Sequence, residues 1–103
     1  MSDLETYPEG LGRTASVRYT GTTATISVTH KTPQGELKPL AAFCQRNWKK
    51  KFLFEHDGVV YTVAFHEIAA KGSVNLYDRK ELVAGRPVLK SRADIVLKVL
   101  SDA

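Results

Sequence analysis

The sequence predicts an α+β fold, with a small, mostly antiparallel sheet of four to five strands and two or three helices packed on one face. Three features of the chain lead to this prediction. Residues alternate between apolar and polar over several short stretches, which is typical of strands with one solvent-facing side. Other stretches begin with a helix-capping residue and carry apolar residues at helical spacing. The connections are short, which favours antiparallel pairing with the helices on one face.

The length and composition are those of one domain with a single core. The chain has 103 residues, of which 43% are hydrophobic and 25% are charged. Residues 1–12 contain Pro8, Gly10 and Gly12 and no apolar period, so we expect a flexible N-terminal tail. Residues 13–103 are then expected to form the single α+β domain.

A first hairpin is predicted over residues 14–20 and 24–30. Both stretches alternate and are rich in β-branched residues, and Gly21 lies between them as a turn residue. The residues expected to face the core are Ala15, Val17, Tyr19, Ala24, Ile26 and Val28. The opposite face carries mainly threonine and serine, so it is expected to be a polar surface.

A helix from Lys38 to about Arg46 is expected after a turn at residues 32–35. Pro39 suits the first turn of a helix, because its missing N–H needs no partner there. Asn47 is expected to close the helix in the left-handed conformation. The apolar stripe at helical spacing consists of Leu40, Phe43 and Cys44.

A second hairpin is predicted over residues 48–55 and 59–65. Asp57 and Gly58 lie between two β-rich stretches, which is the strongest short hairpin signal in the chain. Both faces of the second strand are largely apolar, which is typical of a strand in the interior of a sheet.

The next part of the chain is predicted to contain a helical turn at residues 66–72 and a short strand at 73–77. A short helix is predicted at residues 79–84. Asp78 is a suitable residue to begin this helix, and Gly85 is a suitable residue to end it.

The chain is predicted to end in a further helix. Ser91 is a suitable N-cap, and Asp94 follows it at the spacing of a capping pair. The apolar stripe of this helix would consist of Ile95, Val96, Val99 and Leu100.

The order of these elements leaves a second architecture open. Five short strands can also curl into a small half-open barrel. In either arrangement the core is expected to contain Val17, Tyr19, Ile26, Val28, Phe54, Tyr61, Val63, Phe65, Ile95, Val99 and Leu100.

The positive charge of the chain is concentrated in one short segment. The chain has 15 lysines and arginines against 11 acidic residues, which gives a formal net charge of +4. Six consecutive positions without an acidic residue hold four of these basic residues, Arg46, Lys49, Lys50 and Lys51. This segment therefore accounts for the whole excess of positive charge, which favours contact with a polyanion or an acidic partner.

The catalytic and metal-binding patterns are each incomplete. His66 and Glu67 begin like a helical zinc motif, but Ala70 stands where the second histidine is needed. Cys44 has basic neighbours but shares the apolar stripe of a predicted helix, so we expect a buried thiol. The sequence has no nucleophile elbow, phosphate-binding glycine loop or dinucleotide fingerprint. We therefore predict a protein that is not an enzyme and that uses no metal and no cofactor.

Residues 46–52 form the one segment that is expected to carry a function. Lysine and arginine neutralise phosphates, and the ring of Trp48, the only tryptophan, can stack on a base. The predicted partner is nucleic acid or a nucleoprotein complex. The predicted binding residues are Arg46, Trp48, Lys49, Lys50 and Lys51.

Two other interpretations of this segment stay open. The protein could be a protein-only adaptor or inhibitor that covers the surface of a partner enzyme. The same residues also suit an ordinary sheet edge, where a tryptophan anchors the sheet and lysines prevent unwanted strand pairing.

The chain is expected to be cytoplasmic and to have no membrane partner. Its one cysteine cannot form an internal disulfide. No apolar run approaches the ~18 residues that cross a membrane. Acidic residues stand near the N-terminus, where a signal peptide has basic and then apolar residues.

Overall fold

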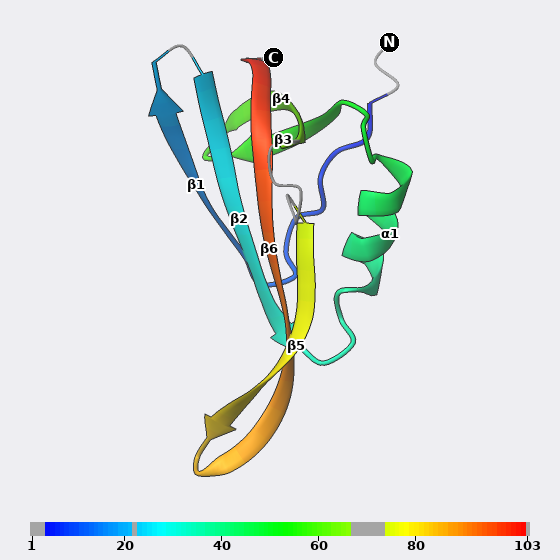
Figure 1. Ribbon diagram of the computed structural model, residues 1–103, viewed down its shortest axis with the longest axis vertical. Helices are drawn as coiled ribbons and strands as arrows, with labels where there is room; N and C mark the ends of the chain where they lie inside the picture. Colours follow the sequence, from blue (N-terminus) through cyan, green and yellow to red (C-terminus); the bar gives the residue numbers. More distant parts are fainter. Residues whose placement is uncertain (1–3, 22, 67–73, 103) are drawn as a thin grey trace.

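One long strand, β6 (Arg86–Asp102), connects all parts of the sheet. The computed structural model describes residues 4–21, 23–66 and 74–102. One edge of β6 pairs with β2 (Thr23–Pro33), and the other edge pairs with β5 (Val74–Val83) and then with β4 (Val59–Phe65). The sheet continues through β1 (Arg13–Thr20) beyond β2 and through β3 (Phe52–His56) beyond β4. All of these strand pairs are antiparallel, as Figure 1 shows.

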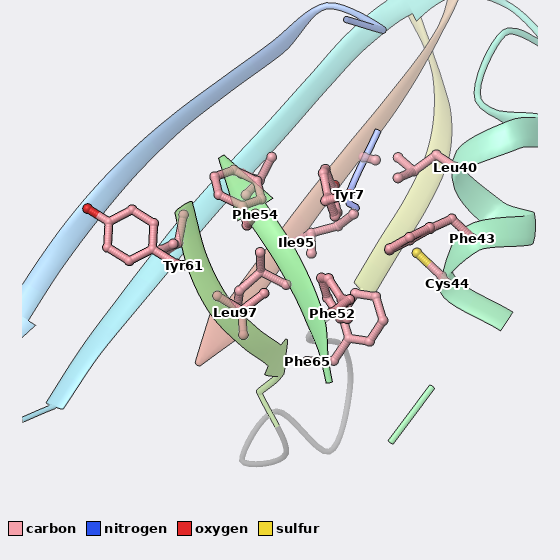
Figure 2. Packing of buried hydrophobic residues seen from close by; sticks show 14 of the residues in the cluster. Tyr7, Leu40, Phe43, Cys44, Phe52, Phe54, Tyr61, Phe65, Ile95 and Leu97 are labelled. Atoms are coloured by element: carbon pink, nitrogen blue, oxygen red, sulfur yellow. The ribbon is translucent and has the colours of Figure 1, made fainter. Parts of the chain in front are cut away.

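A single helix, α1 (Lys38–Arg46), packs against one face of this sheet (Figure 1). Its buried residues are Leu40, Phe43 and Cys44, the stripe that the sequence predicts. They meet aromatic side chains of β3 and β4, and the rings of Phe43 and Phe52 lie edge to face with their centroids 5.1 Å apart (Figure 2). No helix in the described part of the chain is long and apolar enough to cross a membrane.

The predicted α+β class, with two or three helices on one face of the sheet, is therefore wrong. The described residues form a six-stranded sheet with one helix, which is a mostly β structure. The helix at 38–46 and the hairpins around residues 21 and 57–58 are confirmed. The two helices expected near the C-terminal end are both strands, and the turn expected at residues 66–72 falls on residues that, except for His66, lie outside the described ones.

The predicted final helix is a strand. The prediction was wrong because the apolar residues of this segment fit both the period of a helix and the period of a strand. Ile95, Val96, Val99 and Leu100 fit one helical stripe, but Ala93, Ile95 and Leu97 also alternate as a strand requires. The strand alternation is the one that the protein uses. Ala93, Ile95 and Leu97 are at most 1% exposed, whereas Leu100 is 41% exposed.

The predicted helix at 79–84 is the end of β5. Gly85, which was expected to end that helix, is instead the second residue of a two-residue turn that begins with Ala84. Both residues have positive φ, 52° and 77°, which is the conformation of a hairpin turn that matches the twist of the strands. Pairing between β5 and β6 therefore outweighs the helix-capping signals of Asp78 and Gly85.

Residues 4–12 lie against the sheet rather than apart from it. Tyr7, within the stretch expected to be a flexible tail, is 1% exposed and belongs to the core. Its backbone N–H donates to the carbonyl of Leu53, whose own N–H donates to the carbonyl of Glu5. The chain then turns into β1 at Gly12, which has φ of 64° and where a Cβ would collide with the carbonyl oxygen of Lys31, so that only glycine fits.

The sheet is strongly curled, which brings its two outer strands together at one end. Arg13 of β1 donates from Nη2 to the carbonyl oxygen of Glu55 in β3 at 2.8 Å. Its guanidinium also lies 4.6 Å from the centre of the Phe54 ring. No strand pairing joins β1 and β3 among the described residues, so the second predicted architecture, a small half-open barrel, stays a prediction.

Most of the predicted core is confirmed. Ile26, Val28, Phe54, Tyr61, Val63, Phe65 and Ile95 are buried, and Val17 and Val99 are partly buried against them. Two residues differ. Tyr19 is 69% exposed near the turn of the first hairpin, and Leu100 is exposed on the outer face of β6.

Two substitutions to aspartate test the strand assignment of β6. Ile95→Asp should unfold the protein, because a buried, unpaired carboxylate costs several kcal/mol against a total stability of about 5–15 kcal/mol. Leu100→Asp should leave it folded, because that side chain reaches water. Circular dichroism during thermal unfolding measures both, and equal loss of structure in the two variants would contradict the strand.

His30 on β2 is fully buried and is held in its neutral form. Its Nδ1 lies 3.1 Å from the carbonyl oxygen of Leu11, which can only accept, so Nδ1 carries the proton. Its Nε2 therefore accepts a hydrogen bond from the hydroxyl of Tyr7, with 2.7 Å between the oxygen and the nitrogen. Burial lowers the pKa of His30 and raises the pKa of Tyr7, because both charged forms would lose their hydration.

The free energy of unfolding should fall on mild acidification because of His30. Its folded pKa lies below the unfolded value of about 6.5, so its contribution is complete above that pH and is lost as the pH falls through the folded pKa. Urea unfolding at pH values from about 7.5 down to about 5 measures this. His30→Gln should flatten the dependence, and the control His56→Gln should keep it. An unchanged dependence in His30→Gln would assign the effect to another group.

Candidate nucleic-acid interface

The predicted binding residues lie at the end of α1 and in the tight loop that follows it. We call residues 47–51 the lysine loop. Asn47 begins the loop, and its backbone N–H and side-chain amide both donate to the carbonyl of Phe43, at 3.0 and 3.1 Å. The N–H of Lys50 donates to the carbonyl of Asn47 at 3.0 Å, which closes the turn.

Two details of this loop correct the sequence predictions. Asn47 has φ of −110° and does not adopt the left-handed conformation. Lys49, with φ of 63°, adopts it instead. Strand β3 begins at Phe52 and not at Trp48, so the lysines lie on a turn and the strand faces expected for residues 48–51 do not exist.

Arg46 is paired with an acidic residue from the N-terminal segment. Its Nε and Nη2 donate to Oε1 and Oε2 of Glu5, each at 3.2 Å, which is a two-point contact between planar groups. Asn47 also donates to Oε2 of Glu5, at 3.0 Å. These bonds, Arg46 first, lower the pKa of the Glu5 carboxyl, so it stays ionised and offsets the charge of Arg46.

The three lysines of the loop reach solvent without an ion-pair partner among the described residues. Lys49, Lys50 and Lys51 are all exposed. Within the part of the chain that the structure describes, none of them has an ion-pair partner within 4.0 Å. The loop therefore presents three positive charges in consecutive positions to solvent, and the Arg46 contact places the acidic side chain of Glu5 beside them.

Trp48 lies beside the lysines in sequence but borders a different hollow of the surface. Its ring stacks on that of Phe65, with centroids 5.6 Å apart and an angle of 30° between the planes. It is 50% exposed and borders a mainly apolar hollow with Cys44, Gln45 and Val74. Lys50 and Lys51 instead border a hollow with Glu5, Arg46 and Asn47. The tryptophan and the lysines thus reach neighbouring surfaces rather than one pocket.

The structure adds Glu5 to the residues that the sequence singles out. Sequence reasoning missed it because it lies 41 positions before Arg46 in a stretch without an apolar period. Its only sequence signal is the opposite charge, which does not indicate a contact over that distance. Cys44 is buried, and burial raises the pKa of its thiol to about 11, so the thiolate is disfavoured at neutral pH.

Comparison of the chain with protein-family models, with curated proteins and with solved structures gives no match. Function is therefore inferred from the side chains of the chain itself. The lysine loop and Trp48 are the features from which it can be argued.

Proposed function

We propose that this protein binds nucleic acid, alone or within a nucleoprotein complex, and that the lysine loop contacts the phosphates. The observation that carries the proposal is the set of three consecutive exposed lysines without an ion-pair partner among the described residues. Each lysine that contacts a phosphate releases condensed counterions, which gives an affinity that depends strongly on salt.

The loop geometry supports contact with an extended polyanion rather than with a single small anion. The left-handed turn at Lys49 interrupts any strand alternation, so the three side chains are presented by a turn at the surface. Lysine acts as a point charge on a flexible stem, which suits phosphate contact without base specificity. Arg46, which has the geometry for two-point recognition, is already bonded to Glu5.

Trp48 can contribute to the same ligand by stacking. One face of its ring is covered by Phe65, and half of the side chain remains exposed. An exposed aromatic ring can stack on a base of any sequence. Since its hollow adjoins the lysine loop without including the lysines, Trp48 would contact an unpaired base next to the bound phosphates.

The proposed function is binding without catalysis. Cys44 is the one thiol of the chain, and its raised pKa makes it a poor nucleophile. The rival function, a protein-only adaptor or inhibitor, is separated from nucleic-acid binding by the experiment below.

Replacing Lys49, Lys50 and Lys51 together with alanine should abolish most of the binding to a nonspecific oligonucleotide. Each lost contact should reduce the log–log salt slope by about 0.9 on duplex DNA and about 0.7 on a single strand. Fluorescence of the only tryptophan, Trp48, measures the titration at several salt concentrations. The variant should stay folded, because the replaced side chains are exposed.

A single-charge control comes from the polar face of the first hairpin. Arg18→Ala removes an exposed charge on β1, away from the lysine loop, and should change affinity little. If the triple variant binds the oligonucleotide as the parent does, the assignment of the lysine loop fails. If the parent shows no salt-dependent binding to any oligonucleotide, the proposed function fails and a protein partner takes its place.

Glu5→Gln should strengthen binding to the same oligonucleotide. The substitution removes the acid that Arg46 holds beside the lysine loop and frees the charge of Arg46 for a phosphate. The affinity should rise roughly severalfold at low salt, and the salt slope should become steeper by up to about 0.9 on duplex DNA. The control Glu36→Gln removes an exposed acid from the turn before α1 and should have little effect. Weaker binding by Glu5→Gln would contradict the proposal.

A further inference from the structure

The hairpin of β5 and β6 extends beyond the rest of the sheet as a two-stranded arm. The last pair between β2 and β6 is Pro33 with Lys90. Beyond it, among the described residues, β5 and β6 pair only with each other, down to the turn at Ala84 and Gly85. We call residues 79–90 the arm. It projects at the lower end of the molecule in Figure 1, along the longest dimension of 47 Å.

The arm is a second concentration of positive charge. It holds four basic residues, Arg79, Lys80, Arg86 and Lys90, and one acidic residue, Glu81. Along the sequence, apolar residues and the turn separate Arg79 and Lys80 from Arg86 and Lys90. The hairpin brings them together on both strands of one narrow ribbon.

One cross-strand pair in the arm opposes two like charges. Arg79 lies directly opposite Lys90 in the register of β5 and β6. Like charges at such positions destabilise a strand pair. Glu81 offsets part of this, because its Oε2 lies 3.3 Å from Nζ of Lys90, but Arg79 has no ion-pair partner within 4.0 Å among the described residues. The pair of Arg79 and Lys90 does not stabilise the hairpin, and a bound anion would reduce the repulsion between the two side chains.

The end of the arm carries apolar side chains that the core does not use. Leu82 is 77% exposed and lies opposite Pro87, next to the turn. Val83 and Val88 are 46% and 37% exposed. The arm thus combines basic residues along its length with small apolar residues at its end, and a surface of that kind can contact both phosphates and base edges.

We propose that the arm enters the major groove of duplex DNA, with its basic residues against the phosphates on either side. This inference rests on the proposed nucleic-acid binding and names the partner more closely. A two-stranded ribbon fits the major groove, which is about 12 Å wide, whereas the minor groove is only about 6 Å wide. The freely projecting pairs, from Lys80 with Leu89 to Val83 with Arg86, span about 10 Å of strand, enough to reach the groove floor about 8.5 Å down.

Duplex RNA and single strands do not fit the arm in this way. The major groove of A-form RNA is too narrow and deep for protein side chains. A single strand has no groove and would be bound by the lysine loop alone. The arm should therefore add affinity only for duplex DNA, which separates its contribution from that of the loop.

Two variants that remove equal charge test this assignment. The arm variant replaces Arg79, Lys80 and Arg86 with alanine, and the loop variant replaces Lys49, Lys50 and Lys51 with alanine. Each is titrated against one sequence as duplex DNA, duplex RNA and single-stranded DNA, with duplexes of at least the ~14 base pairs that 47 Å covers. The arm variant should weaken binding to duplex DNA by roughly tenfold or more and reduce its salt slope by up to about 2.7. It should leave RNA and single-strand binding within about twofold of the parent, whereas the loop variant should weaken all three.

Chemical footprinting identifies the groove. Dimethyl sulfate methylates guanine N7 in the major groove and adenine N3 in the minor groove. The parent at saturation should protect guanine N7 and leave adenine N3 reactive, and the arm variant should lose the protection of N7. Thermal unfolding of the arm variant should be unchanged or shifted upward, since Arg79→Ala removes the repulsion with Lys90.

The possible failures point to different conclusions. Equal binding of duplex DNA by the arm variant and the parent, or unprotected guanine N7 in the bound parent, would overturn the arm assignment while leaving the lysine loop in place. Equal losses on duplex and single-stranded DNA would show that the arm acts only as general charge, which also overturns insertion into a groove. No oligonucleotide binding by the parent would overturn both proposals.

Discussion

The alternation of buried and more exposed residues along β6 is the constraint on which the rest of the structure depends. Ala93, Ile95 and Leu97 all face the core, and they can do so together only if the segment is a strand. In that conformation the backbone of β6 can form hydrogen bonds along both edges, and it pairs with β2, β4 and β5. A helix at the same place would leave β2 without a neighbour on its inner side and would separate the two hairpins. Pairing along 17 residues outweighs the local helix signals of Ser91 and Asp94.

The unequal lengths of the neighbours of β6 produce the two basic regions at different places in the fold. β2 stops at Pro33, so the first residues of β6 and the last of β5 extend as the arm. β4 pairs near the other end of β6 and carries β3 with it, which fixes the chain just before β3, where the lysine loop lies. Tyr7 secures the same region from the opposite side by pairing with β3 and donating to His30. The positions of the arm and of the lysine loop at the surface thus both depend on how the neighbouring strands pair with β6.

The sequence was sufficient to predict an element of secondary structure where one local signal dominates. Asp57 and Gly58 specify a turn, and Pro39 with the stripe of Leu40 and Phe43 specifies a helix, and the structure contains both. It was insufficient where two periods fit the same residues, as in residues 91–100, because the choice between them depends on pairing with β2, whose partner residues lie 59 to 73 positions earlier in the chain. The lysine loop could be found from its charge alone. The contact of Glu5 with Arg46 and the assembly of the arm depend on the tertiary structure, which spacing along the chain does not encode.

Amide hydrogen exchange along β6, in the free protein and with duplex DNA, tests the central claim most directly. In the free protein the amides of residues 91–95, 97 and 98 should exchange slowest, because strands pair with them on both sides, and those of residues 86–89 should exchange faster, because they pair only with β5. Duplex DNA should slow exchange at residues 86–89, and single-stranded DNA should not. Uniform protection along residues 86–102 in the free protein, or no change at residues 86–89 with duplex DNA, would contradict the view that one strand is both the centre of the fold and the base of a DNA-binding arm.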